Sequence, residues 1–223
     1  MSERLVGILT QSFFKIIIPG FTVTIPLTIL SFILGTALAL ILALVQIANL
    51  KGLRTIARLY IWIFRGTPLL VQLFIIFYGM PSIGILLDAF PAAIIAFSLN
   101  LAAYNAEVIR SAILAVPAGQ LEAAYMVGLN YPQAMTRIVL PQAARIAFPP
   151  LFNSLIGLTK DTSLASSITV VDLFAVAQQV AARYYEPFAL YCEAALIYLI
   201  FCTFLTWLQR TMEKRMNWKQ KTV

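Results

Sequence analysis

The chain has 223 residues, of which 61% are hydrophobic and only 11% are charged, and its formal net charge is +7. A water-soluble domain averages about 25% charged residues, so this composition excludes a globular protein surrounded by water. Together with a mean hydropathy of +0.88, it predicts an all-α membrane protein in which each span needs roughly 20 apolar residues.

Apolar runs between charges predict five transmembrane spans in a single domain. The first run, Ile16 to Leu50, has 35 residues without a charge. A signal-peptide core has roughly 7 to 15, so we expect this segment to stay in the mature protein. Turn residues between Gly79 and Gly84 separate the second span from the third. Over residues 1–223 we expect spans at about 21–47, 59–78, 89–107, 148–171 and 187–209.

The residue types needed for most enzyme chemistry are missing. Histidine is absent, and the two cysteines, Cys192 and Cys202, lie ten residues apart on one predicted helix. Ten helical residues rise about 15 Å, which is too far for a disulfide. Without histidine, neither a zinc site nor a Cys-His or Ser-His nucleophile can be assembled. We expect no catalytic residue and no metal site in this chain.

Basic residues are distributed unevenly among the expected loops. Eleven of the sixteen follow the first, third and fifth spans. Because basic residues are retained on the cytoplasmic side, we expect the N-terminus outside and the C-terminus inside. This distribution explains the basic excess without a nucleic-acid partner. The eleven are Lys51, Arg54, Arg58, Arg110, Arg137, Arg145, Arg210, Lys214, Arg215, Lys219 and Lys221.

Residues 117–141, between the third and fourth spans, have the pattern of two short helices. Good helix formers run from Gln120 to Val127, and Gly128 is a typical left-handed stop. Asn130 and Gln133 can form a capping box at the start of a second helix, which we expect to run to Leu140-Pro141. The segment is predicted to be a cytoplasmic helix-turn-helix. On periodicity alone, a lipid-facing amphipathic hairpin is the alternative.

The same segment carries a recognisable signature. Glu122-Ala123-Ala124, Gly128, Ile138 and Leu140-Pro141 stand at the spacing of the EAA motif. In this the chain resembles the permease subunits of bacterial ABC importers. Four further motifs resemble the polar amino-acid branch of that family, the histidine, glutamine, arginine and cystine type. They are Gly20 to Thr24, Phe64-Arg65-Gly66-Thr67-Pro68, Ala103-Tyr104-x-Ala106-Glu107-x-x-Arg110 and Lys160-Asp161-Thr162-Ser163-Leu164. Pro26 and Ala39 depart from the usual pattern.

The resemblance implies a type I permease of five spans in the bacterial cytoplasmic membrane. The resemblance also implies that the subunit pairs with an identical or similar one and accepts polar amino acids from an external solute-binding protein. It further implies that two ATPase subunits dock on the EAA segment, where the motif residues are Glu122, Ala123, Ala124 and Gly128. The chain has no G-x-x-x-x-G-K-[ST] phosphate loop, so ATP and Mg²⁺ are expected on the partner ATPase. We expect it to need no cofactor of its own.

Polar side chains within the spans are candidates for a substrate path, because a buried charge needs a partner or a wet cavity. Asp161 or Glu107 could receive the ammonium group of an amino acid, and Lys160 or the Ser163 hydroxyl its carboxylate. Neutral hydrogen bonds would come from Gln72 and Asn100.

Structural interpretations of these charges remain open. Lys160 could pair with Glu107 between helices, or Lys160-Asp161 could mark a break in the fourth span. Glu107 and Arg110 could form an i,i+3 ion pair, and Arg65 could snorkel to the inner surface. A different function is open as well: an ion-coupled amino-acid carrier would use Glu107 and Asp161 as proton or sodium sites and would need no ATPase.

Overall fold

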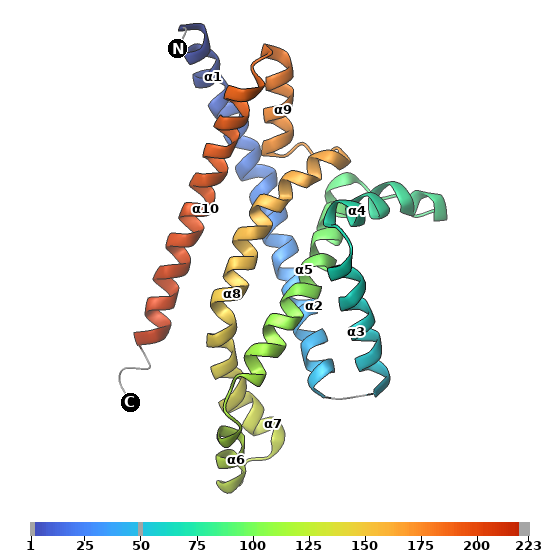
Figure 1. Cartoon of the computed structure of the whole chain (residues 1–223), viewed down its shortest axis with the longest axis vertical. Helices are drawn as coiled ribbons and strands as arrows, with labels where there is room; N and C mark the ends of the chain where they lie inside the picture. The colour runs from blue at the N-terminus through green and yellow to red at the C-terminus, as the bar shows by residue number, and fades with distance from the viewer. Residues whose placement is uncertain (1–2, 49–50, 219–223) are drawn as a thin grey trace. The chain divides into compact units, whose positions relative to one another are not determined.

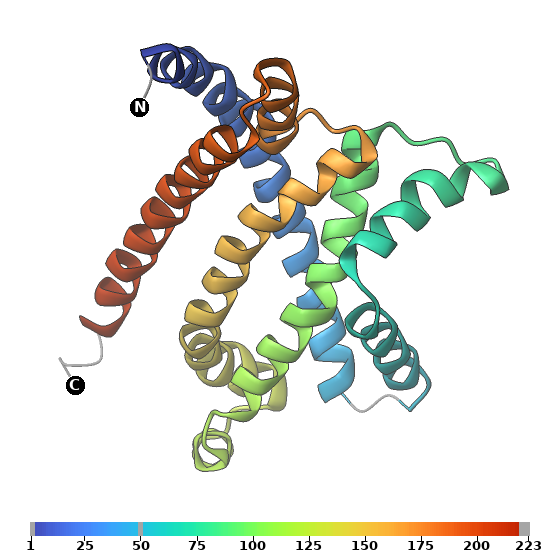
Figure 2. The same cartoon turned by 45° about the horizontal axis from the view of Figure 1, so that its top comes forward.

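The structure, a computed structural model, describes residues 3–48 and 51–218. Within these ranges every regular element is helical (Figures 1 and 2). The α-helices are α1 (Glu3–Pro19), α2 (Ile25–Ile47), α3 (Lys51–Gly66), α4 (Leu69–Phe74), α5 (Ala89–Leu114), α6 (Ala118–Met126), α7 (Tyr131–Ala134), α8 (Leu140–Asp161), α9 (Leu173–Tyr184) and α10 (Pro187–Trp218). Wider π-helical turns cover Gly20–Thr24, Ile75–Gly79 and Met135–Val139, and 3₁₀ stretches cover Met80–Ile83 and Thr162–Ile168.

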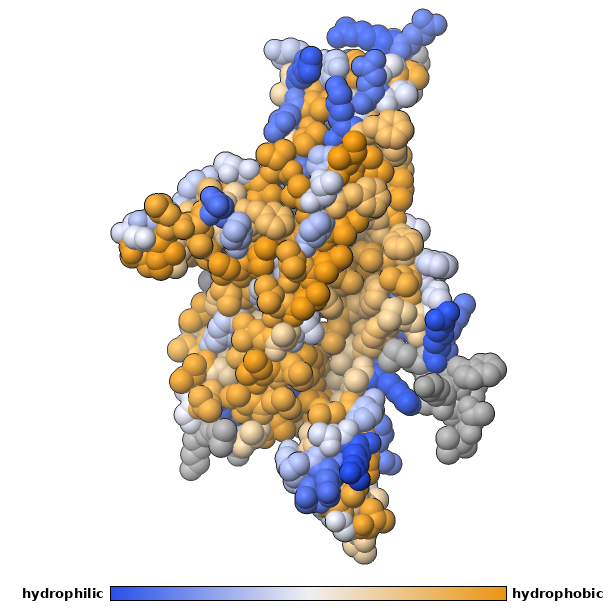
Figure 3. All heavy atoms as spheres, turned by 180° about the vertical axis from the view of Figure 1, so that it is seen from behind, coloured by the Kyte–Doolittle hydropathy of each residue, from blue (hydrophilic) through white to orange (hydrophobic). Residues whose placement is uncertain are grey.

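Three helical segments of the described chain are long and apolar enough to cross a membrane: Glu3–Ile47, Ala89–Leu114 and Pro187–Arg215. The number rises to five if two broken helix pairs each count as one span. On the face drawn in Figure 3, apolar side chains cover most of the helical surface. The all-helical prediction is confirmed for the described residues, and the apolar surface is that of a protein surrounded by lipid.

The helices form two compact units, and each is built from three separate parts of the chain. The first unit comprises residues 1–34, 67–98 and 155–208, of which the first two residues lie outside the described ranges. Its core joins α1, α9 and α10 through buried Ile16, Leu173, Leu190 and Ile197 (Figure 1). At Gly20 the backbone comes so close to α10 that a Cβ atom would lie 2.8 Å from Phe201.

The second unit comprises residues 35–66, 99–154 and 209–223, of which 49–50 and 219–223 lie outside the described ranges. Small residues line its core, including Ala39, Ala43, Ala103 and Ala106, each fully buried. Such residues let helix backbones approach closely in a membrane protein. Polar contacts add to this packing, as the hydroxyl of Tyr60 on α3 donates to the carbonyl of Leu99 on α5 at 2.6 Å.

The first helix begins much earlier than the expected span. We predicted a span from about residue 21, whereas helix runs from Glu3 through a π-helical turn to Ile47. Ile8, Ser12 and Ile16, spaced four apart, are buried on one face of α1. This face packs against α9, so the additional turns are stabilised by a tertiary contact.

The expected second span, about 59–78, is not one continuous helix. It is interrupted between Gly66 and Leu69, where Pro68 has an extended backbone with ψ of 137°. Proline disfavours helical geometry in the residue before it. The Gln72 side chain closes the turn by donating to the carbonyl and hydroxyl oxygens of Thr67 at 3.1 and 2.8 Å.

The second helix of residues 117–141 does not end at Leu140-Pro141, so that part of the prediction is wrong. The chain passes through the π-helical turn Met135–Val139 directly into α8. Pro141 has no backbone N–H and would clash with the carbonyl four residues earlier in a regular α-helix. The wider turn just before it relieves this conflict, so helix continues past the proline.

At its other end, α8 changes to a tighter helix type at Lys160-Asp161, whereas the break in the fourth span lies later, between Ile168 and Leu173. The chain then tightens into the 3₁₀ stretch Thr162–Ile168. Hydroxyl groups there bond to nearby carbonyls, with Ser163 donating to Lys160 at 2.7 Å and Ser166 to Ser163 at 2.7 Å. These local bonds compete with the α-helical pattern and favour the change of helix type.

Candidate functional site

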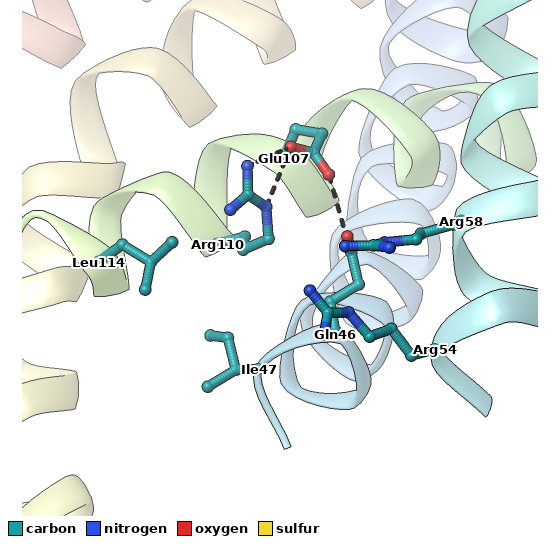
Figure 4. A pocket seen from close by; sticks show the side chains of 7 residues that line it. All are labelled: Gln46, Ile47, Arg54, Arg58, Glu107, Arg110 and Leu114. Atoms are coloured by element: carbon teal, nitrogen blue, oxygen red, sulfur yellow. Dashed lines mark hydrogen bonds and ion pairs between the residues drawn. The ribbon is translucent and has the colours of Figure 1, made fainter. Parts of the chain in front are cut away.

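Guanidinium groups converge on a cavity of about 540 Å³ in the second unit (Figure 4). We call it the arginine cavity. In Figure 4, Arg54 and Arg58 reach from α3 toward Gln46 of α2, while Glu107 and Arg110 lie on α5. The residues that line it are Gln46, Ile47, Arg54, Arg58, Glu107, Arg110 and Leu114.

Glu107 organises this cavity. Its Oε2 atom accepts from Nη2 and Nε of Arg110 at 2.8 and 3.1 Å, and its Oε1 atom accepts from Nε2 of Gln46 at 3.2 Å. The i,i+3 ion pair, which the sequence left open as a structural alternative, is therefore present. A carboxylate held by a bidentate guanidinium and an amide already has its charge compensated.

A neighbouring cavity of about 470 Å³ shares Gln46, Arg58 and Glu107 with the arginine cavity and adds side chains farther along α3. Among them, Arg65 places its guanidinium carbon 5.4 Å from the centre of the Tyr104 ring. This cation–π geometry gives Arg65 a partner within the protein. Trp62 lines the same cavity.

A cavity in the first unit, of about 510 Å³, contains two of the predicted substrate-path residues, Lys160 and Ser163. We call it the aromatic cavity, because Phe174, Tyr191 and Tyr198 supply much of its wall. The rings of Phe174 and Tyr191 are 5.9 Å apart. The ammonium group of Lys160 can bind an anionic group, and the aromatic side chains offer apolar contact to an organic body.

Behind the aromatic cavity, Asp172 is completely buried. Its Oδ1 atom accepts from the backbone N–H of Ala175 at 2.8 Å and so caps α9, and Oδ2 accepts from the Tyr198 hydroxyl at 3.3 Å. This carboxylate therefore positions a wall residue of the cavity. We did not anticipate it from the sequence, although an aspartate directly ahead of a helical run is a recognisable cap signal.

The other predicted substrate-path residues are dispersed. Gln72 is buried and bonds to Thr67 within the first unit, whereas Asn100 belongs to the second unit, where its amide lies 3.5 Å from the Phe64 carbonyl. Asp161 is exposed at the end of α8. Lys160 and Glu107 belong to different units. Of the six candidates, Lys160 and Ser163 line one cavity together.

The turn between α6 and α7 has the geometry that its residues predicted. Gly128 is left-handed, with φ of +83°, and its N–H donates to the carbonyl of Tyr125 at 3.0 Å, while Leu129 donates to Ala124 at 3.0 Å. This pair of bonds is a Schellman motif. Asn130 and Gln133 form the predicted capping box, with both bonds at 3.0 Å.

Burial divides the EAA residues into an inner and an outer face. Ala124 is buried, whereas Glu122, Ala123 and Gly128 are exposed. Apolar side chains at the end of α6 are exposed as well, with Met126 88% and Val127 75% exposed. We call the exposed residues Tyr125, Met126, Val127 and Tyr131 the apolar tip.

Sequence reasoning missed the convergence of the arginines, since we interpreted Arg54 and Arg58 only as topology signals. A signal was present in their spacing. Arg54, Arg58 and Arg65 stand at i, i+4 and i+11, which places all three on one face of α3.

Comparison with known proteins agrees with the fold. Residues 35–218 match the family model described as binding-protein-dependent transport system inner membrane component. The chain is 50% identical to the L-cystine transport system permease protein TcyB of Bacillus subtilis, over 93% of this chain and 89% of that protein. It is 41% identical to the octopine transport system permease protein OccM of Rhizobium radiobacter, over 84% of this chain and 80% of that protein.

Solved structures of ABC transporters have the same fold as this chain. A crystal structure of an amino acid ABC transporter with histidines superposes with a TM-score of 0.88 at 33% identity, covering 96% of this chain and all of that one. An inward-facing MetNI methionine ABC transporter, at 20% identity, shares the fold with a TM-score of 0.70. The chain therefore belongs to the family of binding-protein-dependent transport system inner membrane components, the permeases of ABC importers.

Proposed function

We propose that the chain is the membrane-spanning subunit of an ATP-driven importer of polar amino acids, and that α6 and α7 are the contact through which a separate ATPase drives it. The apolar tip is the observation that carries this proposal. Four large apolar side chains stand exposed beside a Schellman turn and a capping box that are both fully hydrogen-bonded. A preformed helical projection of this kind suits insertion into a groove on a partner protein.

The EAA segment is packed onto the other helices of the second unit, to which it belongs. Ala124 and Val139 are buried, and Leu121 and Met135 pack against the core that α2, α3 and α5 share. The side-chain amide of Gln142 on α8 donates to Gln120 of α6 at 3.3 Å. A push on the projection is thus passed to α8 and to the packed helices rather than absorbed by a flexible loop.

The proposed orientation follows the basic residues. The EAA segment and the C-terminus lie in the cytoplasm, where the ATPase and its ATP and Mg²⁺ are found, and the N-terminus lies outside, in contact with the compartment of the solute-binding protein. Two of the proposed cytoplasmic basic residues, Lys219 and Lys221, fall outside the described residues. The permease works as a pair, with an identical or a similar subunit, as importers of this family do.

The proposed cargo is a polar amino acid. Two relatives, TcyB and TcyL of Bacillus subtilis, are named as cystine permeases, so cystine is the first compound to test. Lys160 and Ser163 would receive its carboxylate at the aromatic cavity, and Asp161 its ammonium group. Gln72, Asn100 and Glu107 would contact the substrate in other conformations of the permease. These conformations are reached when the ATPase shifts the equilibrium between outward-open and inward-open packing.

Docking can be tested with a matched pair of variants. Met126→Asp places a charge on the apolar tip, whereas Tyr185→Asp changes an equally exposed residue, at 89%, between α9 and α10. We expect Met126→Asp to abolish co-purification of the cognate ATPase and ATP-dependent uptake, and Tyr185→Asp to leave both near wild type. Normal co-purification by the Met126→Asp protein would contradict the proposed docking surface.

A further inference from the structure

The arginine cavity carries an excess of positive charge. Three guanidinium groups, from Arg54, Arg58 and Arg110, line it together with one carboxylate, that of Glu107. Glu107 is already bound by Arg110. The neighbouring cavity adds the guanidinium of Arg65 and again only Glu107 as a counter-charge among its lining residues. A concave surface with this balance attracts an anion.

The face of α3 opposite these arginines is apolar and exposed. Leu53, Ile56, Leu59 and Ile63 are all exposed on it. At 100° per residue they lie on the side of the helix away from Arg54, Arg58 and Arg65. Helix α3 is therefore amphipathic: its charged face lines the cavity, and its apolar face is exposed on the surface of the protein.

Trp62 connects the two faces. It lines the cavity beside Arg58 and Arg65, yet 72% of its surface is exposed. By helical geometry it stands between the arginine face and Leu59. An indole at such a boundary is typical of the interface between lipid head groups and acyl chains.

These features together select a ligand with an anionic head and an apolar tail. We propose that the arginine cavity binds the headgroup of an anionic phospholipid, with the phosphate at Arg54 and Arg58 and an acyl chain along Trp62 and the apolar face of α3. Basic pockets between membrane helices are known to suit such head groups. A free phosphate would use the same guanidinium groups but would leave the apolar face without a role. This inference does not depend on the proposed transport function.

The test is native mass spectrometry of the full chain in detergent, titrated with phosphatidylglycerol or with phosphatidylcholine of the same acyl chains. We expect wild type to retain phosphatidylglycerol at least tenfold better. Arg54→Gln/Arg58→Gln should weaken that binding about thirtyfold, the size expected for two basic groups at an anionic surface. Arg54→Lys/Arg58→Lys should stay within a few-fold of wild type, which separates loss of charge from loss of fold.

A second pair of basic residues provides the charge-matched control. Arg145 and Lys214 are exposed and do not line the cavity, so Arg145→Gln/Lys214→Gln should retain phosphatidylglycerol within twofold of wild type. Equal loss in both double variants would overturn the proposal, as would equal retention of the two lipids by wild type. Displacement of the lipid by inorganic phosphate or glycerophosphoglycerol at comparable concentration would show a free-phosphate site and would overturn it too.

Discussion

The Glu107 carboxylate accepts two hydrogen bonds from the guanidinium of Arg110, one turn along α5, at 2.8 Å from Nη2 and 3.1 Å from Nε. A third bond, from Gln46, ties the same carboxylate to α2. Glu107 thus cross-links two helices and is also the negative charge of the arginine cavity. Its replacement has separate effects on stability and on anion binding.

For Glu107→Gln we expect the free energy of unfolding to fall by about 1 kcal/mol or less, because the pair is partly exposed. Phosphatidylglycerol binding should rise about fivefold, since the cavity loses its counter-charge. Thermal unfolding and native mass spectrometry measure the two effects. Glu3→Gln on α1 is the control, and unchanged lipid binding in Glu107→Gln would separate Glu107 from the anion site.

Gly128 tests the left-handed turn after α6. Its φ of +83° is strained for any residue with a Cβ, and an added Cβ would meet no atom within 4 Å, so strain is the main effect of a substitution. Gly128→Ala should therefore cost about 1 to 2 kcal/mol from backbone strain alone. Gly128→Leu should in addition weaken ATPase docking. Amide hydrogen exchange across α6 and co-purification with the ATPase measure these effects.

Gly119 supplies the matched control for that glycine. It lies inside α6, also with nothing within 4 Å of an added Cβ, so Gly119→Ala should stabilise the helix by roughly 0.5 to 1 kcal/mol. If both alanine variants changed α6 exchange in the same direction, the left-handed turn would not be what holds the segment.

Gly20 tests the packing of the first unit. An added Cβ would lie 2.8 Å from Cε2 of Phe201 and 3.0 Å from Cδ1 of Leu173. Gly20→Ala should therefore lower the free energy of unfolding by about 1 to 3 kcal/mol through overpacking. Gly7→Ala, where nothing lies within 4 Å, should be neutral or stabilising. Adding Phe201→Leu to Gly20→Ala should recover part of the loss, and a melting temperature equal to wild type in Gly20→Ala would refute the close contact.

Asp161 distinguishes a substrate-path role from a structural one. Asp161→Asn keeps the size of the side chain and removes its charge, so the assembled complex should be recovered in normal yield. Uptake should fall about tenfold to a hundredfold, the range for one hydrogen bond to a charged group. Asp88→Asn, an exposed carboxylate just before α5, should leave uptake unchanged. Wild-type substrate affinity in Asp161→Asn would mean that Asp161 is structural.

Features decided within a few residues could be predicted from the sequence. The left-handed Gly128 and the Asn130–Gln133 capping box are present as expected, because a missing Cβ and a side chain that bonds three residues away act locally. The all-helical class followed from composition in the same way, since a lipid environment leaves few alternatives.

Features that depend on distant residues could not be predicted. The helical start at Glu3 is stabilised by packing on α9, about 170 residues farther along the chain. The arginine cavity needs α2, α3 and α5 to meet, and Gln46 and Glu107 are 61 residues apart. Without that pairing, Arg54 and Arg58 have the pattern of ordinary cytoplasmic charges. The break at Pro68 could be predicted only in part. The sequence shows the proline, but whether a proline ends a helix depends on the surrounding structure.

Uptake into proteoliposomes tests the central claim most directly. Vesicles containing the chain with its cognate ATPase and solute-binding protein, with ATP on the ATPase side, should accumulate cystine or another polar amino acid against its gradient, and ionophores should have no effect. Vesicles containing the chain alone should accumulate nothing under any ion gradient. Uphill uptake by the chain alone, driven by a proton or sodium gradient and insensitive to ATP, would contradict the account.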